Sequence, residues 1–218
     1  MKKITQKELD KRIELHQEWL KDNSKGEVLD LVNCDLSYLS VVDVDLRFAD
    51  LIDCDLSYVT ILNSNLRYAN LNGSKLRFAD LTNSDLGDAK LHNTDLSYAK
   101  LRSTNLSFAY LKESNLAFTD LRHAILSCAN LTYCTLDNTR LSESNTNQVY
   151  GIDMYSIDNI GTFSGKVTYV PSIDTVYAGC WSGTLEQFLE KGLEMNKGNK
   201  QETKNIKLAY QFFKNNSK

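Results

Sequence analysis

The chain has 218 residues, of which 42% are hydrophobic and 24% charged, and its formal net charge at pH 7 is −3. This slightly acidic balance argues against direct binding of nucleic acid, and no apolar stretch approaches the roughly 20 residues that a membrane-spanning helix needs. Charged residues near the N-terminus leave no apolar run typical of a signal peptide. We therefore expect a cytoplasmic protein with reduced thiols and no membrane contact.

Residues 5–21 are predicted to form an amphipathic helix. Thr5 and Glu8 have the spacing of a capping box at its start. One face of the helix gathers apolar and aromatic side chains, namely Leu9, Ile13, His16 and Leu20, with Trp19 alongside. The polar stretch 21–27 is predicted to be a loop that leads into the next part of the chain.

From residue 30 to residue 141 a branched aliphatic residue recurs at every fifth position. There are 23 such centres, and all are Leu except Val41 and Ile61. A helix requires spacings of three and four, and a half-buried strand a spacing of two, so a strict spacing of five indicates a short turn that repeats. The sequence therefore predicts an all-β solenoid with the aliphatic centres inside.

The positions around each centre are patterned as well. The residue two before the centre is usually small, and the residue just before it is Asp or Asn in 14 of the 23 units. Asp and Asn suit turns because their side chains bond nearby backbone N–H groups. The pattern, seen in Ala69-Asn70-Leu71, Ala79-Asp80-Leu81 and Ala109-Tyr110-Leu111, resembles the pentapeptide-repeat family. This resemblance implies a right-handed quadrilateral β-helix with four pentapeptides per coil.

The first coil of a solenoid has an open core and unpaired strand edges, which invite aggregation unless something covers them. We expect helix 5–21 to be this lid. The inward position that is normally small carries larger residues only before residue 60, where extra volume can meet the helix. These larger residues are Leu29, Leu39, Val44 and Val59.

The residue two after each centre alternates between aromatic and mostly polar. In the four-sided geometry the aromatic residues separate onto two opposite sides. The longer set is Tyr38, Tyr58, Phe78, Tyr98 and Phe118, and the shorter set is Phe48, Tyr68 and Phe108, interrupted by Asp88. Stacked rings stabilise a sheet surface, and long sets also expose ring area that is typical of docking sites. The longer set is our main candidate interaction surface.

Charge is unevenly spread along the repeat. Between residues 30 and 58, seven acidic residues accompany a single base, Arg47. Further along, basic residues balance the acids. The acidic start adds Asp35, Asp45, Asp50 and Asp55 to the candidate interaction residues.

The five cysteines are odd in number and show no CxxC spacing. Cys34 and Cys54 both take the small inward position one predicted coil apart, at a separation of about 5 Å that a disulfide could span. The preferred interpretation is that they are buried thiols that replace Ala. A disulfide between them is the alternative.

After Leu141 the spacing fails. Short strands are predicted around residues 155–160, 166–170 and 175–180, followed by a helix from a capping box at Thr184 to about Met195 and a last helix over 201–214. Trp181 is a candidate interaction residue. The stretches Cys180-Trp181 and Thr184-Leu185-Glu186-Gln187-Phe188 resemble a C-terminal module of some phage and prophage pentapeptide-repeat proteins.

Motifs that would indicate an enzyme are missing from the sequence. There is no glycine-rich phosphate loop, no serine elbow, no HExxH and no zinc-type cysteine pair. The many Asp residues occupy one turn position unit after unit, so they do not indicate a hydrolase. We predict no catalytic, cofactor-binding or metal-binding residues, while an enzyme based on the C-terminal part stays a minor alternative.

The sequence thus predicts three regions: a capping helix and loop over 1–27, the repeat over 28–146, and a small C-terminal α+β module over 147–218. The favoured function is a non-enzymatic scaffold or effector that binds a protein partner, in a phage-related setting. The alternative is a DNA mimic that inhibits or protects a type II topoisomerase such as DNA gyrase, a function that the family resemblance implies. The ten bases of the repeat count against mimicry. A homodimer is compatible with the sequence.

Overall fold

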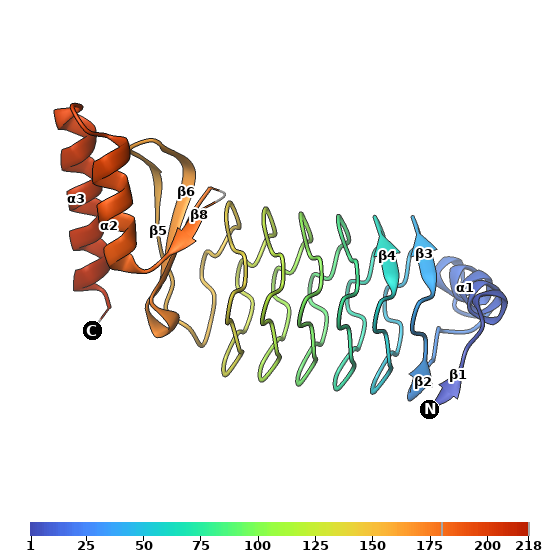
Figure 1. Ribbon diagram of the computed structural model, residues 1–218. Coiled ribbons are helices and arrows are strands. Elements are labelled where there is room, and N and C mark those ends of the chain that lie inside the picture. The colour runs from blue at the N-terminus through green and yellow to red at the C-terminus, as the bar shows by residue number, and fades with distance from the viewer. Residues whose placement is uncertain (180, 218) are drawn as a thin grey trace.

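The computed structural model describes residues 1–179 and 181–217. Figure 1 shows a column of stacked coils with helix α1, Gln6–Lys21, at one end and a sheet with two helices at the other. Among the described residues, no helix is both long and apolar enough to cross a membrane.

The coils are joined by parallel pairing between residues 20 positions apart. Strand β3, Ser40–Val42, pairs with β4, Thr60–Leu62, while most other contacts are single bridges such as Asp35↔Asp55 and Lys75↔Asp95. A period of 20 residues corresponds to four pentapeptides per coil. The pairing continues past the last Leu centre to the bridge between Asn130 and Tyr150.

Two local features form the corners: a side-chain hydrogen bond in the units that have Asp or Asn before the centre, and a left-handed residue in every unit. The Asp or Asn before the centre accepts a hydrogen bond from the backbone two residues on, as Asp95 Oδ1 does from Ser97 N at 3.1 Å. This confirms the turn role predicted for these residues. The residue two after the centre is left-handed, for instance Tyr98 with φ 62°. That conformation costs a non-glycine residue about 1–2 kcal/mol.

The interior contains buried hydroxyl groups as well as Leu and Ala. At the small inward position, Ser84 Oγ donates to the carbonyl oxygen of Ile61 at 3.0 Å, and Thr94 Oγ1 donates to that of Leu71 at 3.1 Å. Each bond joins a coil to the one before it. The sequence showed these residues only as small, because their partners lie 23 positions away.

The N-terminal segment caps all four sides of the first coil, as the lid prediction requires. Four backbone carbonyl oxygens of that coil, at Asp30, Asp35, Ser40 and Asp45, accept hydrogen bonds from this segment. Their respective donors are Arg12 Nη1 at 3.0 Å, Ile4 N at 2.9 Å, Gln6 Nε2 at 2.8 Å and Gln17 Nε2 at 2.5 Å. Strand β1, Lys2–Lys3, pairs beside Ile4 with β2, Cys34–Asp35. Side chains of α1 therefore replace the backbone donors of a missing coil.

Two details of α1 differ from the sequence prediction. Thr5 accepts a hydrogen bond from Glu8 N at 3.2 Å, but the Glu8 carboxylate pairs with Lys2 and Arg12, so the predicted capping box is only half formed. The charged partners outcompete the backbone N–H for this carboxylate.

His16, which the sequence placed on the apolar face of the helix, is fully buried. Its Nδ1 accepts a hydrogen bond from Leu29 N at 3.1 Å, and its Nε2 is buried with no partner among the described residues. Burial lowers the pKa of His16, with Asp45 partly opposing that shift.

A pH dependence follows from His16. Because its folded pKa lies below the value of 6.5 for a free imidazole, the unfolded chain binds more protons between the two values. This contribution to stability is fully present above pH 6.5 and is lost progressively as the pH falls from that value to the lower pKa of the folded protein. Thermal unfolding from about pH 7.5 down to about pH 5.5 should show a steeper loss of Tm in the wild type than in His16→Gln. Parallel curves for the two proteins would contradict this role.

The C-terminal segment forms a four-stranded antiparallel sheet in the order β5-β6-β7-β8, covered by two helices. The strands are β5 Tyr155–Ile160, β6 Phe163–Val170, β7 Thr175–Ala178 and β8 Trp181–Gly183, with a short 3-10 turn, η1 Pro171–Ile173, between β6 and β7. Helices α2, Leu185–Met195, and α3, Lys200–Asn215, lie on the side of the sheet away from the coils (Figure 1). They enclose a second hydrophobic cluster around Phe188 and Phe213.

The predicted strands and helices of this segment need small corrections. The second strand begins at Phe163, the third ends at Ala178, and β8 was not predicted, because a three-residue edge strand containing Gly183 gives no alternating pattern. The predicted end of the third strand at Cys180 lies outside the described residues. The capping box of Thr184 and Gln187 is confirmed in both directions.

Candidate functional site

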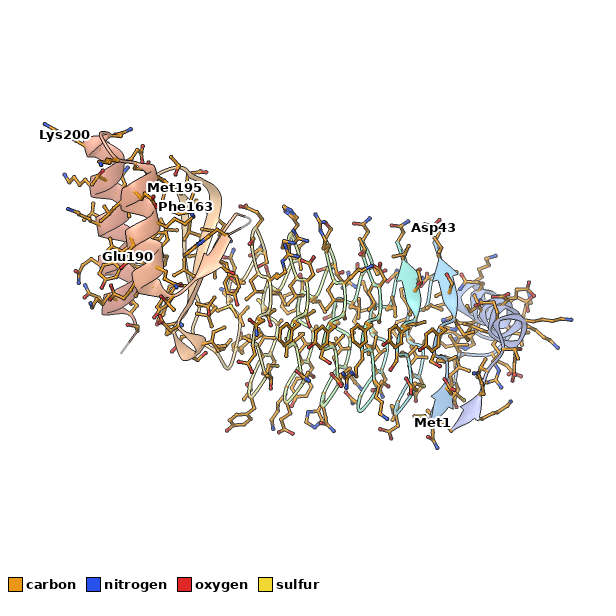
Figure 2. The ribbon with its side chains drawn as sticks, in the orientation of Figure 1. Met1, Asp43, Phe163, Glu190, Met195 and Lys200 are labelled. Atoms are coloured by element: carbon orange, nitrogen blue, oxygen red, sulfur yellow. The ribbon has the colours of Figure 1, made fainter. Side chains whose placement is uncertain are left out.

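Five rings form one continuous stack along the column. We call this set, Tyr38, Tyr58, Phe78, Tyr98 and Phe118, the long ladder. Its successive ring centroids are 4.9, 4.8, 4.9 and 4.7 Å apart, and each pair of planes is parallel within 16°. These spacings equal the distance between neighbouring strands, so the backbone pairing sets the ring stacking. Figure 2 shows ring side chains repeated in a row from coil to coil.

The long ladder is exposed, with 72% of Tyr38 and 40–46% of the other four rings open to solvent. Ring faces inside the stack are covered by the neighbouring rings, so the ladder offers its ring edges. Because ring edges are positive and faces negative, such a surface suits carbonyl oxygens and other ring faces of a partner. It is a poor platform for nucleic-acid bases, which need free ring faces.

The opposite row of rings is broken. Phe48 and Tyr68 stack at 5.2 Å, but Asp88 takes the next place and pairs with Arg67 at 2.7 Å. Phe108 is 62% exposed beyond this gap. Trp19 of α1 packs edge-on against Phe48 at 6.3 Å, so the helix covers the start of this row. The long ladder is therefore the larger uninterrupted aromatic surface.

The four candidate carboxylates do not gather at one place. They lie in three different columns of bridges, with Asp35 above Asp55, Asp50 above Asn70, and Asp45 above Asn65. All four are half-buried, and each accepts a hydrogen bond from a nearby turn N–H. The Ser37 hydroxyl and N–H lower the pKa of Asp35.

The more exposed acids of the first coils are Asp30, Asp43 and Asp53. Figure 2 shows Asp43 at the outer edge of the column. Asp30 also accepts a turn hydrogen bond, from Val32 N at 3.1 Å, whereas Asp43 and Asp53 occupy the left-handed position two after a centre. The sequence analysis counted these three acids but did not select them, because spacing alone does not show which carboxylates are the more exposed.

Further along the column, acids and bases pair with each other. Lys100 lies 3.2 Å from Asp80, and Arg122 lies 2.5 Å from Asp120, which Arg140 approaches at 3.6 Å. Because of these ion pairs, the later part of the column lacks the acidic character of the first two coils.

Trp181 lies on β8, at the other end of the molecule from the acidic coils. It is half-buried and contacts Phe163 with ring centroids 6.0 Å apart. The structure therefore does not bring it together with the long ladder, and it belongs to the C-terminal hydrophobic cluster.

The inward thiols are free. Cys34 and Cys54 form no disulfide, so the preferred interpretation of two buried thiols is confirmed. Cys54 Sγ donates to the carbonyl oxygen of Leu31 at 2.9 Å, and burial raises the pKa of this thiol to about 11. It is therefore a poor nucleophile. Within residues 1–179 and 181–217, no group of three or more His, Cys, Asp or Glu side chains is arranged to hold a metal ion.

Two cavities lie between the last coil and the C-terminal segment, and neither was predicted from the sequence. The first, of about 490 Å³, is lined by Tyr133 and Cys134 on the coil and by Pro171 and Ser172 opposite. The second, of about 350 Å³, is lined on the coil by Asn138, Thr139 and Arg140, and opposite by residues that include Ile173, Asp174 and Tyr177. The Tyr177 hydroxyl is buried without a partner among the described residues.

The repeat also matches a family model. The description "Pentapeptide repeats" fits eight copies in overlapping matches over residues 30–67, 61–97, 69–107, 89–127 and 104–143. The chain belongs to the pentapeptide repeat family. Such repeats imply a right-handed β-helix for this part of the chain. No curated protein matches the chain.

Solved structures similar to this chain are pentapeptide repeat proteins too. Rfr23 from the cyanobacterium Cyanothece 51142 is 25% identical, with 62% of this chain and 95% of that chain covered and a TM-score of 0.42. A protein of the Arabidopsis thaliana thylakoid lumen is 27% identical, with coverages of 49% and 67% and a TM-score of 0.38. QnrB1, a plasmid-mediated fluoroquinolone resistance protein, is 16% identical, with coverages of 59% and 69% and a TM-score of 0.28.

Proposed function

We propose that this chain is a non-enzymatic scaffold that binds a protein partner through the long ladder. In this proposal the repeat over 28–146 is the right-handed, four-sided β-helix, residues 1–27 cap it, and the module over 147–218 helps to select the partner. In this proposal the protein is cytoplasmic and acts as an effector in a phage-related context. The observation that carries the proposal is the unbroken stack of five exposed rings.

Physical reasoning favours a protein as the partner. Aromatic residues are enriched at protein interfaces, and Tyr in particular contributes large contact area with little loss of conformational entropy. The stack holds each ring rigidly, because its neighbours lie 4.7–4.9 Å away on the adjacent coils. A partner therefore meets a preorganised surface, which reduces the entropy lost on binding.

The test is a quantitative pull-down with full-length variants. Replacing Tyr58, Phe78 and Tyr98 together with Ser should lower the amount of partner retained by about tenfold or more, because several central rings of the interface are lost. The matched control replaces Tyr68 and Phe108 with Ser on the opposite row and should retain the partner. If the triple variant retained every partner of the wild type, the long ladder would not be the binding surface.

A second candidate is a DNA mimic that acts on a type II topoisomerase. It is favoured by the exposed carboxylates of the first coils at Asp30, Asp43 and Asp53, which could face a basic DNA-binding groove. The pairs formed by Asp80 and Asp120 with bases limit this acidic surface to one end. A DNA gyrase supercoiling assay distinguishes the two candidates. Mimicry would be favoured if the wild-type protein inhibited supercoiling and a triple variant with Asp30→Asn, Asp43→Asn and Asp53→Asn did not. No effect of the wild-type protein on supercoiling would exclude it for gyrase.

A further inference from the structure

The first and last coils of the column differ in how their outer backbone groups are hydrogen-bonded. At the first coil, every side receives a hydrogen bond from the N-terminal segment. At the last coil, the side that carries the long ladder is one of three sides whose backbone N–H groups bond to no described residue, the others being the sides of Leu141 and Glu143 and of Thr146 and Gln148. Among the described residues, the backbone N–H groups of Leu136 and Asn138 and the carbonyl oxygen of Cys134 have no hydrogen-bond partner.

The preceding coils show what such an edge binds. One coil earlier on the same side, Leu116 N donates to Thr135 O at 2.9 Å and Phe118 N donates to Asp137 O at 2.8 Å. In return, Thr135 N donates to Ser114 O at 3.0 Å. At that earlier coil, the edge is thus occupied by an extended segment of three residues, 135–137. The edge at 134–138 has the same three backbone groups, and none of them bonds to a residue that the structure describes.

Exposure confirms that this edge is open. Asp137 is exposed, whereas its counterpart one coil earlier, Ala117, is half-buried and the one before that, Ser97, is 4% exposed. The two cavities lie at the two ends of this edge, with η1 opposite both of them. Pro171 of η1 has no N–H to offer, and the turn makes no backbone hydrogen bond to the edge. The C-terminal segment covers the apolar core of the last coil through Val170 and Tyr177, but its described residues form no hydrogen bond with these donors.

We propose that the edge at 134–138 binds an extended segment of the protein partner by strand addition. Unpaired backbone groups at a sheet edge are a template for another strand, and main-chain hydrogen bonds provide the affinity of such complexes. Asn138 lies one coil beyond Phe118 on the side of the long ladder, next to the bridge between Asn115 and Thr135. A strand added here therefore places the rest of the partner along the ladder. This inference rests on the proposed function and adds to it the conformation and the docking point of the partner.

The experiment measures amide exchange and chemical shifts by NMR in the full-length protein. In the free protein, the amides of Leu136 and Asn138 should exchange about 100-fold faster than those of Leu116 and Phe118, which are paired. The probe is a synthetic peptide with the sequence of residues 93–100, acetylated and amidated, because it contains the segment that pairs on this side two coils earlier. At millimolar concentration it should shift the Leu136 and Asn138 amides and slow their exchange about tenfold.

Two controls make the result specific. The same peptide methylated on the nitrogen of Asp95 lacks the donor for Cys134 O and should not bind. Ser172→Trp narrows the cavity beside the edge and should weaken binding of the unmodified peptide, whereas Ser103→Trp, on another side of an earlier coil, should leave it unchanged. The variant with Ser at positions 58, 78 and 98 should still bind the peptide, so failure of the edge and failure of the ladder are distinguishable.

Three results would overturn the proposal. The first is slow exchange of Leu136 and Asn138 in the free protein, which would mean that the chain itself already bonds or covers these amides. The second is a peptide that shifts neither amide. The third is equal binding of the methylated peptide, which would place the contact away from the edge.

Discussion

Leu86→Asp is expected to lower the free energy of unfolding by about 3–5 kcal/mol, because it places an unpaired carboxylate inside the column. Leu86 is fully buried at mid-column, and the coils on both sides surround it. No basic partner is available in the core, because no Lys or Arg is among the buried residues that the structure describes. Urea unfolding followed by circular dichroism measures the change.

The matched control is the neighbouring Asp85→Ser. Asp85 Oδ1 accepts hydrogen bonds from Gly87 N at 2.8 Å and from Asn105 Nδ2 at 2.9 Å, both at the surface of the column. Ser retains an acceptor for the turn, so the loss should be about 1 kcal/mol. Similar losses for the two variants would show that the inward register is wrong.

Replacing Gln6, Arg12 and Gln17 with Ala together should destabilise the protein by about 2–4 kcal/mol and cause self-association, because three carbonyl groups of the first coil lose their donors. Each of these side chains crosses from the cap to a different side of the first coil. Thermal unfolding and light scattering after size-exclusion chromatography measure both effects.

The control for the cap is a triple replacement on the outer face of the same helix. Lys7, Lys11 and Glu14 are exposed. Ala has a higher helix propensity than these residues, so Tm should stay the same or rise slightly. A monomeric cap variant with unchanged Tm would show that the edge contacts of α1 contribute nothing.

Sequence could predict the core and the long ladder because both follow one period. A centre every fifth residue determines which side chain points inwards, and an alternation every tenth residue places Tyr58 and Phe78 in contact when a coil has four sides. The turn role of Asp95 also follows from local chemistry, because its acceptor is used only two residues away. These features depend on neighbours in sequence or on an exact repeat.

The features that sequence missed depend on partners far apart in the chain. Gln6 bonds the backbone of Ser40 across 34 positions, and Thr94 bonds that of Leu71 across 23. The residue type alone does not predict a hydrogen bond to a backbone group so far away in the chain. The left-handed conformation of Tyr98 and the other ladder residues was also not predicted, because aromatic side chains rarely adopt it. Ring stacking and the pairing of each ladder N–H offset its cost.

The candidate site was predicted unevenly for the same reason. The long ladder assembles as expected, whereas Asp35, Asp45, Asp50 and Asp55 are spread over three columns and are used in turns. Trp181 lies apart because the orientation of the C-terminal segment follows no repeat. The open edge at 134–138 could not be predicted from the sequence, because it depends on how the C-terminal segment is placed against the last coil.

The most direct test of the account is site-specific photo-crosslinking in cells, with a photoreactive aromatic amino acid in place of Phe78 on the long ladder or Phe108 on the opposite row. The account predicts a discrete covalent complex with one protein from position 78 and none from position 108. The same adduct from both positions, or none from position 78, would contradict the claim that this protein acts through its long aromatic ladder.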